Sequence, residues 1–257
     1  MYGIELGVLY RGERELCFLP LAHAYSCAFN FLVPMAVGAH VYLLGKVPSP
    51  KILLKAFEEV KPNLILTVPL ILEKIYKKMI LPQLSKTTMK VALNIPLLDS
   101  RIYAQIRKKL VDAFGGRFRE VIVGGAAMNE EVTNFLYKIK FPFTIGYGMT
   151  ECGPLISYDH NDEYVPGSCG QILKGIMKVR IDSEDPYNKV GEIQVSGENV
   201  MKGYYKNEEA TSKVFTEDGW LRTGDLGTID ADNRIYIRGR SKTMILGASG
   251  QNIYPEE

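Results

Sequence analysis

The stretch of sequence that decides the fold covers residues 144–151 and reads TIGYGMTE. Its first two residues end an apolar segment that begins at Phe141, and this segment predicts a short strand. In the loop that follows, Tyr147 offers a ring that can stack on a base, Thr150 a hydroxyl for a phosphate, and Glu151 an oxygen ligand for Mg²⁺. The stretch therefore predicts a nucleotide site at the end of a strand. A glycine-rich turn with a packed tyrosine and a solvated glutamate is the alternative interpretation.

The residues before this stretch alternate between strand and helix patterns. Strands are predicted at residues 39–44, 63–68 and 120–123, and helices at residues 50–60 and 100–113. Two further helices are expected after Pro69 and after Asn129, which is a good N-cap residue. Such repeated strand–helix–strand units predict an α/β fold with a mostly parallel sheet flanked by helices.

The pattern changes near residue 158. Residues 177–182 and 192–196 alternate apolar and polar side chains, as half-buried antiparallel strands do, and turn residues recur between them. We therefore predict a small antiparallel, barrel-like subdomain after the parallel sheet. The expected domain boundaries are 1–157, 158–237 and 238–257.

The composition is that of an ordinary soluble globular protein. Hydrophobic residues make up 46% of the 257 residues, and 31 basic side chains nearly balance 29 acidic ones, so nothing calls for a nucleic-acid partner. Four widely spaced cysteines and the lack of a leader-like start predict reduced thiols in the cytoplasm. The most apolar stretch, residues 28–45, is broken by Asn30, Pro34 and His40, and predicts a buried helix and a buried strand rather than a membrane span.

A second glycine-rich loop follows the predicted strand at residues 120–123. It contains Gly124, Gly125 and Ala126, and one predicted helix separates it from the 144–151 stretch. Ligands of open parallel sheets bind beyond the carboxyl ends of the strands. We therefore expect this loop and Gly148 to let the backbone approach the same ligand.

Three further side chains are candidates for binding. Asp225 lies in a TGDLG turn, where a carboxylate can accept hydrogen bonds from the two ribose hydroxyls, and Arg240 can contact a phosphate or ribose. His23 follows the residues LPLA and either lies beside a substrate carboxylate or is a core histidine. For Asp225 the alternative is a structural role in the turn, and for Arg240 it is an ordinary surface position.

Several known site patterns are absent from the sequence. There is no G-x-x-x-x-G-K-[ST] phosphate loop, and the glycines at 146 and 148 do not complete G-x-G-x-x-G. The motifs G-x-S-x-G and H-E-x-x-H are missing as well.

Taken together, six segments resemble the motifs of the adenylate-forming (AMP-binding) enzymes, most closely those of bacterial long-chain fatty-acid–CoA ligases. They are LPLAHAY at 19–25, GGAAM at 124–128, GYGMTE at 146–151, GSCG at 167–170, TGD at 223–225, and GRSK at 239–242 with SGQNIYPEE at 249–257. The resemblance implies the second part of a large α/β domain at 1–157, a small β-rich subdomain with the ribose motif at 158–237, and a hinge from 238 onward.

The resemblance also implies a role for each matching residue. The residues implied to bind ATP or AMP are Gly124, Gly125, Ala126, Tyr147, Gly148, Thr150, Asp225 and Arg240. Thr150, Glu151 and His23 would take part in catalysis, at the α-phosphate, at Mg²⁺ and near the acyl carboxylate. Lys242 would lie at the hinge between the two half-reactions.

The implied reaction joins a fatty acid to ATP, releases pyrophosphate, and passes the acyl group from the adenylate to CoA with release of AMP. ATP, Mg²⁺ and CoA are the implied cofactors and co-substrates. No carboxylate lies near Tyr25 to pair with an amino group, which argues against an amino acid as the substrate. Two alternatives are an acyl-AMP ligase that serves a carrier protein and a nucleotide-binding module without catalysis.

Two departures from the family pattern concern the adenylation step. The family's Ser/Thr/Gly-rich phosphate loop has no counterpart before Leu19, and the domain with the catalytic lysine would lie beyond Glu257. We therefore expect the chain alone to be nearly inactive. A basic region is either a solvated helical face or a contact for the inner membrane surface or CoA phosphates. It comprises Lys74, Lys77, Lys78, Lys86, Lys90, Arg101, Arg107, Lys108 and Lys109.

Overall fold

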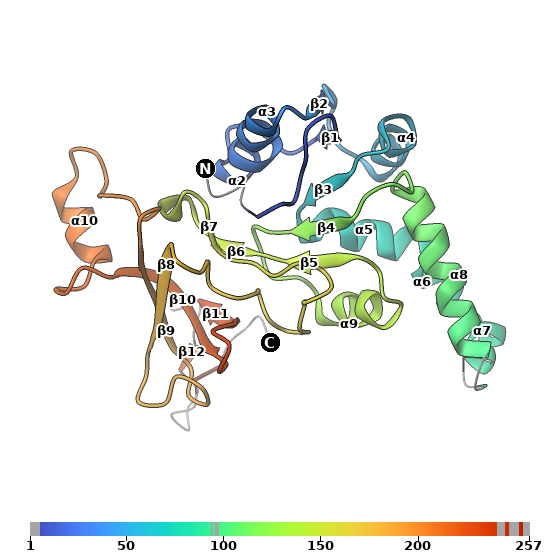
Figure 1. Cartoon of the computed structure of the whole chain (residues 1–257). Helices are drawn as coiled ribbons and strands as arrows, with labels where there is room; N and C mark the ends of the chain where they lie inside the picture. The colour runs from blue at the N-terminus through green and yellow to red at the C-terminus, as the bar shows by residue number, and fades with distance from the viewer. Residues whose placement is uncertain (1–5, 94, 96–97, 241–244, 247–251, 254–257) are drawn as a thin grey trace. The chain divides into compact units, whose positions relative to one another are not determined.

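The computed structural model describes residues 6–93, 95, 98–240, 245–246 and 252–253 (Figure 1). The chain forms two compact units. The first comprises Met1–Thr144 and His160–Pro166, and the second comprises Ile145–Asp159 and Gly167–Glu257.

The first unit is built on a five-stranded sheet with the strand order β2-β1-β3-β4-β5. The strands are β1 (Arg14–Cys17), β2 (His40–Leu43), β3 (Leu64–Thr67), β4 (Glu120–Val123) and β5 (Phe143–Ile145). Parallel pairings join β1 to β2, β1 to β3, and β3 to β4. The predicted α/β fold with a parallel sheet flanked by helices is thereby confirmed.

Helices α4 and α9 of this unit begin where the sequence predicts, whereas α6 and α7 were not predicted and α8 begins two residues before the expected start; Figure 1 labels all of them. Ser49 accepts a hydrogen bond from the backbone N–H of Ile52 at the start of α4, and Asn129 does the same for Val132 at the start of α9. The helices are α4 (Pro50–Val60), α5 (Pro69–Met79), α6 (Leu81–Leu84), α7 (Thr87–Ala92), α8 (Leu98–Ala113) and α9 (Glu130–Lys138).

The segment between β1 and β2 contains a π-helical stretch. It consists of α2 (Ala24–Ser26), the π-helix η1 (Cys27–Leu32) and α3 (Val33–Val37), which ends at Gly38 with a left-handed φ of 77°. The expectation of a buried strand next to it is wrong for β2. Because β2 is the edge strand of the sheet, Leu43 stays 63% exposed. None of the described helices is both long and apolar enough to span a bilayer.

An aromatic cluster forms the core where α4 and α8 meet. Phe57 at the end of α4 stacks on Phe114 with ring centroids 5.1 Å apart, and Phe114 also contacts Phe118 and Phe141. The turn after α8 passes so close to α4 that a Cβ at Gly115 would lie 2.5 Å from the Phe57 carbonyl oxygen. Only glycine fits there, which explains the glycine pair at the end of α8.

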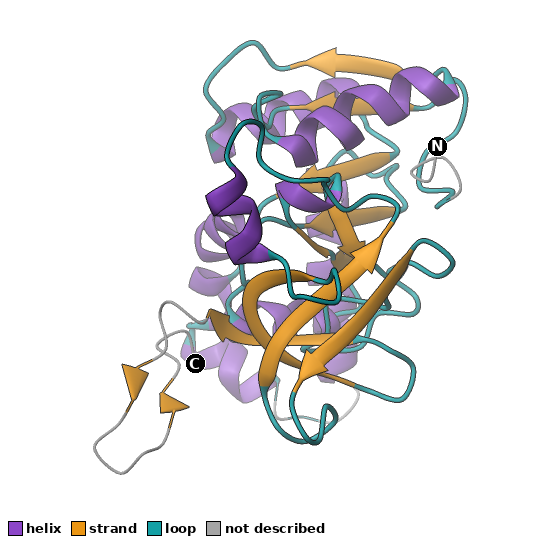
Figure 2. Cartoon of the chain, turned by 90° about the vertical axis from the view of Figure 1, so that its left-hand side faces the viewer, coloured by secondary structure: helices purple, strands orange, loops and turns teal. Residues whose placement is uncertain are grey.

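The second unit contains the predicted antiparallel sheet, whose long strands are orange in Figure 2. The order is β11-β10-β9-β8, with β8 (Met177–Asp182), β9 (Gly191–Gly197), β10 (Leu221–Ile229) and β11 (Ile235–Arg240). The unit also holds the hairpin strands β6 (Tyr147–Gly148) and β7 (Leu155–Ser157), the helix α10 (Glu208–Val214), and the pair β12 (Ile245–Leu246) and β13 (Asn252–Ile253).

Trp220, the one tryptophan of the chain, lies at the start of this sheet, and the guanidinium of Arg180 packs over its ring at 4.5 Å. The four cysteines have free thiols, of which those of Cys17 and Cys152 are buried.

A polar side-chain network is buried beneath the π-helix in the first unit. Glu15 on β1 is fully buried and accepts a 2.5 Å hydrogen bond from the side-chain amide of Asn30, which in turn accepts one from the Ser26 hydroxyl. The other carboxyl oxygen of Glu15 has no partner. Burial raises the pKa of Glu15 from about 4.5 to about 8, against the lowering effect of the Asn30 hydrogen bond.

The raised pKa of Glu15 predicts that the stability of the protein falls as the pH rises. Between about pH 4.5 and pH 8 the folded state keeps the proton on Glu15 that the unfolded state gives up, so proton loss favours unfolding. Glu15→Gln removes this titration. At about 1.4 kcal/mol per pKa unit, the free energy of unfolding of the variant relative to wild type should rise by about 3 kcal/mol from pH 5 to pH 8. Urea unfolding at pH 5 and pH 8 measures the difference in the free energy of unfolding between the variant and wild type. A difference that does not change with pH would contradict the prediction.

Candidate functional site

The GYGMTE stretch forms a short hairpin in the second unit. Tyr147 and Gly148 of β6 pair with Ser157 and Leu155 of β7. The connection contains a 3-10 turn at Thr150–Cys152 and ends with a backbone hydrogen bond from Met149 N–H to the Pro154 carbonyl. The loop after the predicted strand is therefore a turn held by backbone hydrogen bonds.

Gly148 is required by the close approach of the two hairpin arms. A Cβ at this position would lie 2.0 Å from the carbonyl oxygen of Pro154, which no side chain can do. The hairpin therefore requires a glycine at position 148 for steric reasons, whether or not a ligand also approaches the backbone there.

Tyr147 and Asp225, which are 78 residues apart in sequence, meet inside the second unit. The Tyr147 hydroxyl donates a 2.7 Å hydrogen bond to Asp225 Oδ2. Burial, followed by the negative charge of Asp225, raises the pKa of Tyr147 well above its usual range, so its hydroxyl stays protonated and donates. The ring of Tyr147 is only 7% exposed.

Arg240 completes this cluster from the neighbouring strand. Asp225 on β10 faces Arg240 on β11 across the antiparallel ladder, and Arg240 Nε lies 3.1 Å from Asp225 Oδ1. The Asp225 backbone N–H donates to the Thr223 hydroxyl, and that hydroxyl donates to the Ile193 carbonyl on β9. The three predicted residues Tyr147, Asp225 and Arg240 are thus brought together, with both carboxylate oxygens of Asp225 engaged.

Thr150 and Glu151 lie in the 3-10 turn of the hairpin loop. Thr150 is exposed and Glu151 half-buried. Glu151 Oε1 accepts a 2.9 Å hydrogen bond from the hydroxyl of Tyr204, a residue that the sequence patterns did not indicate. Within the described part of the chain, no three His, Cys, Asp or Glu side chains cluster as metal ligands would.

The remaining predicted residues lie in the first unit. Gly124 N–H donates to the Thr67 carbonyl, while Gly125 and Ala126 are exposed after β4. A Cβ at Gly124 would lie 3.3 Å from the ring of Tyr25, whose hydroxyl donates to the Ile122 carbonyl.

His23 is exposed at the start of α2, two residues before Tyr25. The alternative of a core histidine is therefore wrong. Tyr25 links this end of α2 to the Gly124 loop, so the LPLAHAY and GGAAM segments are neighbours in the first unit. Lys242, the expected hinge residue, lies outside the described residues.

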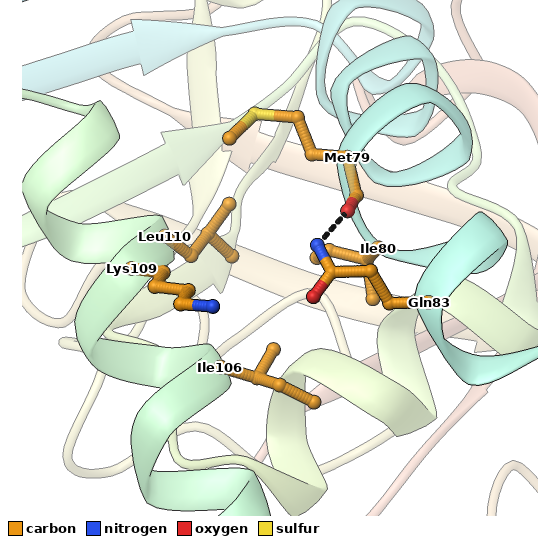
Figure 3. Close-up of a pocket in the computed structure, with 6 residues that line it drawn as sticks. All are labelled: Met79, Ile80, Gln83, Ile106, Lys109 and Leu110. Atoms are coloured by element: carbon orange, nitrogen blue, oxygen red, sulfur yellow. Dashed lines mark hydrogen bonds between the residues drawn. The ribbon is translucent and has the colours of Figure 1, made fainter. Parts of the chain in front are cut away.

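A small apolar cavity lies elsewhere in the first unit, between α5, α6 and α8 (Figure 3). Its volume is about 20 Å³, the space of roughly one water molecule. It is lined by Met79, Ile80, Gln83, Ile106, Lys109 and Leu110, and none of the residues expected to bind nucleotide is among them. The Gln83 side-chain amide donates to the Met79 carbonyl at its rim.

A parallel sheet followed by a four-stranded antiparallel sheet, with the GYGMTE and TGD segments joined by a buried hydrogen bond, defines the class of adenylate-forming enzymes. A family model for the AMP-binding enzymes matches residues 3–205, most of the chain. The chain therefore belongs to the AMP-binding enzyme family.

Characterised relatives are similar over nearly the whole chain. Long-chain-fatty-acid–CoA ligase 1 of Saccharomyces cerevisiae is 28% identical over 95% of the chain, and the FadD15 ligase of Mycobacterium tuberculosis is 29% identical over 96%. A 4-coumarate–CoA ligase of Narcissus pseudonarcissus is 31% identical over 90%. The chain spans only 38%, 43% and 39% of the length of these three relatives.

Solved structures have the same fold. ATP-bound MatB from Rhodopseudomonas palustris superposes with a TM-score of 0.71 at 25% identity, over 96% of this chain and 44% of that one. The O-succinylbenzoate coenzyme A synthetase of Bacillus subtilis, in complex with ATP and magnesium ion, superposes with a TM-score of 0.73 at 24% identity, over 99% of this chain and 47% of that one.

The close approach at Gly148 predicts a large loss of stability for Gly148→Ala, because the added methyl group would overlap the Pro154 carbonyl. We expect a decrease of roughly 3 kcal/mol in the free energy of unfolding, measured by chemical denaturation. Gly219→Ala is the matched control. Its φ is +84° but a methyl group there meets nothing within 4 Å, so only the backbone cost of about 1 kcal/mol applies. Equal losses in the two variants would contradict the steric argument.

Proposed function

We propose that the protein activates a long-chain fatty acid with ATP, forming an acyl-adenylate and pyrophosphate, and then transfers the acyl group to CoA with release of AMP. The observation that carries this proposal is the buried Tyr147–Asp225 hydrogen bond with Arg240 on the other carboxylate oxygen. It places a ring, a carboxylate and a guanidinium together in a chain of the AMP-binding family.

We assign the nucleotide contacts as follows. Asp225 would accept hydrogen bonds from the ribose hydroxyls, because its two carboxylate oxygens offer about four acceptor sites and the contacts with Tyr147 and Arg240 occupy one each. The exposed Arg240 side chain can move to assist at the ribose or a phosphate. Tyr147 would lie against the adenine with Gly148 beside it.

In the first unit, the backbone of Gly124, Gly125 and Ala126 is proposed to contribute contacts to the adenine. The exposed Thr150 hydroxyl would donate to the α-phosphate.

Glu151 is the proposed ligand of Mg²⁺. Its half-buried carboxylate has the hard oxygen donors that the ion prefers, and the phosphates of ATP would supply further oxygens. When bound, the ion neutralises negative charge on the phosphates as pyrophosphate leaves. Glu151 itself contributes a fixed negative charge, and Thr150 orients the phosphate that the acid attacks.

The acid is proposed to bind on the side of His23 and Tyr25. The exposed His23 can hold the substrate carboxylate near the nucleotide, and the rings of Tyr25 and Phe29, 6.1 Å apart, give this segment an apolar surface. Long-chain fatty-acid–CoA ligases among the relatives favour a fatty acid. The similarity to a 4-coumarate–CoA ligase makes an aromatic acid the competitor to test.

Nucleotide binding by the chain is the first test. AMP titrated calorimetrically should bind, and Asp225→Asn should weaken binding by roughly tenfold, because it replaces a charged acceptor of the ribose hydroxyls. Asp162→Asn, the same change at an exposed residue of the other unit, is the control and should bind AMP as wild type does. No AMP binding by the wild-type chain, or equal binding by Asp225→Asn, would refute the nucleotide assignment.

The reaction is tested with the full-length gene product, because the relatives that support it are longer than this chain. We expect pyrophosphate release from ATP that depends on fatty acids of long chain and not on 4-coumarate, with a CoA thioester as product. Release without a thioester in the presence of CoA would favour an acyl-AMP ligase that serves a carrier protein. Nucleotide binding without release for any acid would favour a binding module.

A further inference from the structure

The carboxylate of Glu151 is held by a side chain that none of the family motifs quoted above contains. Tyr204, 53 residues further along the chain, donates its hydroxyl to Glu151 Oε1 at 2.9 Å. We infer that Tyr204 is a positioning residue for Glu151: it fixes the carboxylate through Oε1 and leaves Oε2 to bind the metal ion of the Mg·ATP complex. This inference rests on the proposed role of Glu151.

Backbone contacts bind the same two segments to each other. The Met201 N–H donates to the Glu151 carbonyl at 2.7 Å. The Asn199 side-chain amide donates to the carbonyls of Cys152 and Leu155, at 2.6 and 2.9 Å. The Glu151 turn is therefore held along its main chain, and the Tyr204 hydrogen bond holds its carboxylate.

Tyr204 is itself fixed by the start of α10. Its backbone N–H donates to the Thr211 hydroxyl at 2.9 Å, and this hydroxyl donates to the carbonyl of Asn207, the N-cap residue of the helix. Gly203 before it has a φ of +148°, and a Cβ there would lie 2.8 Å from Thr211. These contacts hold the backbone of Tyr204 against the first turn of α10.

A tyrosine suits this task better than a cation would. Its hydroxyl is a neutral donor, so it orients the carboxylate and leaves the full negative charge of Glu151 for a metal ion. A lysine or arginine at the same place would neutralise the charge that attracts Mg²⁺.

The test compares how much Mg²⁺ strengthens ATP binding in four forms of the chain. For each form, the Kd for ATP is measured calorimetrically in EDTA and again in saturating Mg²⁺, and the ratio of the two is the magnesium enhancement. Glu151→Gln should lose the enhancement. Tyr204→Phe, which keeps the ring and removes the hydroxyl, should reduce it by about threefold or more, since one hydrogen bond to a charged group is lost.

Two controls separate positioning from general damage. Tyr205→Phe makes the same change at the adjacent tyrosine, which is 88% exposed, and should keep the wild-type enhancement. The Kd of Tyr204→Phe for AMP should equal that of wild type, because AMP binding does not need the metal. A merely structural role would weaken AMP and ATP binding together and so overturn the inference.

The outcomes distinguish this inference from the proposed function. If wild type shows no magnesium enhancement, the metal role of Glu151 is wrong, and the inference is refuted with it. If Glu151→Gln loses the enhancement but Tyr204→Phe keeps it, only the inference is refuted. A larger enhancement in Tyr204→Phe would mean that the phenol competes with the metal for the carboxylate, which also overturns positioning.

Discussion

The hydrogen bond between Tyr147 and Asp225 is the interaction on which the organisation of the second unit depends. It is buried, 2.7 Å long, and joins a two-stranded hairpin to the middle of a four-stranded antiparallel sheet. The Tyr147 hydroxyl is buried at the cost of losing water, and the Asp225 carboxylate compensates by accepting its hydrogen bond, because an unpaired buried phenol is costly. The same hydrogen bond holds together the GYGMTE and TGD segments, both of which contain residues proposed to bind nucleotide. A structural requirement and a binding arrangement thus coincide at one pair of atoms.

The features that the sequence predicts well are those with a local physical cause. The helices α4 and α9 begin where Ser49 and Asn129 can cap them, and the four strands of the antiparallel sheet include the two segments with apolar–polar alternation. Periodicity and caps involve neighbours within a few residues, so one chain suffices to read them. The prediction for β2 failed because burial of a strand depends on its position in the sheet, and an apolar run does not show whether the strand lies at an edge.

The features that the sequence does not predict are pairs of residues far apart in the chain. Glu15 directly follows Glu13 and Arg14, and its sequence neighbours give no sign that Asn30 donates to it. Tyr204 and Tyr205 are adjacent tyrosines, and the sequence does not show that one of them contacts Glu151. Each pair is a single long-range hydrogen bond, which leaves no periodic trace. A weak signal did exist at Gly203, because a glycine directly before two aromatic residues suggests a constrained backbone. The roles expected for the site residues, from His23 and the Gly124 loop to Asp225, Arg240 and Lys242, all stay predictions.

The position of Trp220 has a practical consequence for spectroscopy. Because the one tryptophan of the chain lies in the second unit, packed under Arg180, its emission reports the melting of that unit and is silent about the first. Far-ultraviolet circular dichroism is dominated instead by helices, most of which belong to the first unit. In one sample, tryptophan emission therefore follows the unfolding of the second unit, and circular dichroism follows mainly that of the first. Coincident transitions would establish that they unfold as one cooperative body, and separated transitions that each is a folding unit of its own.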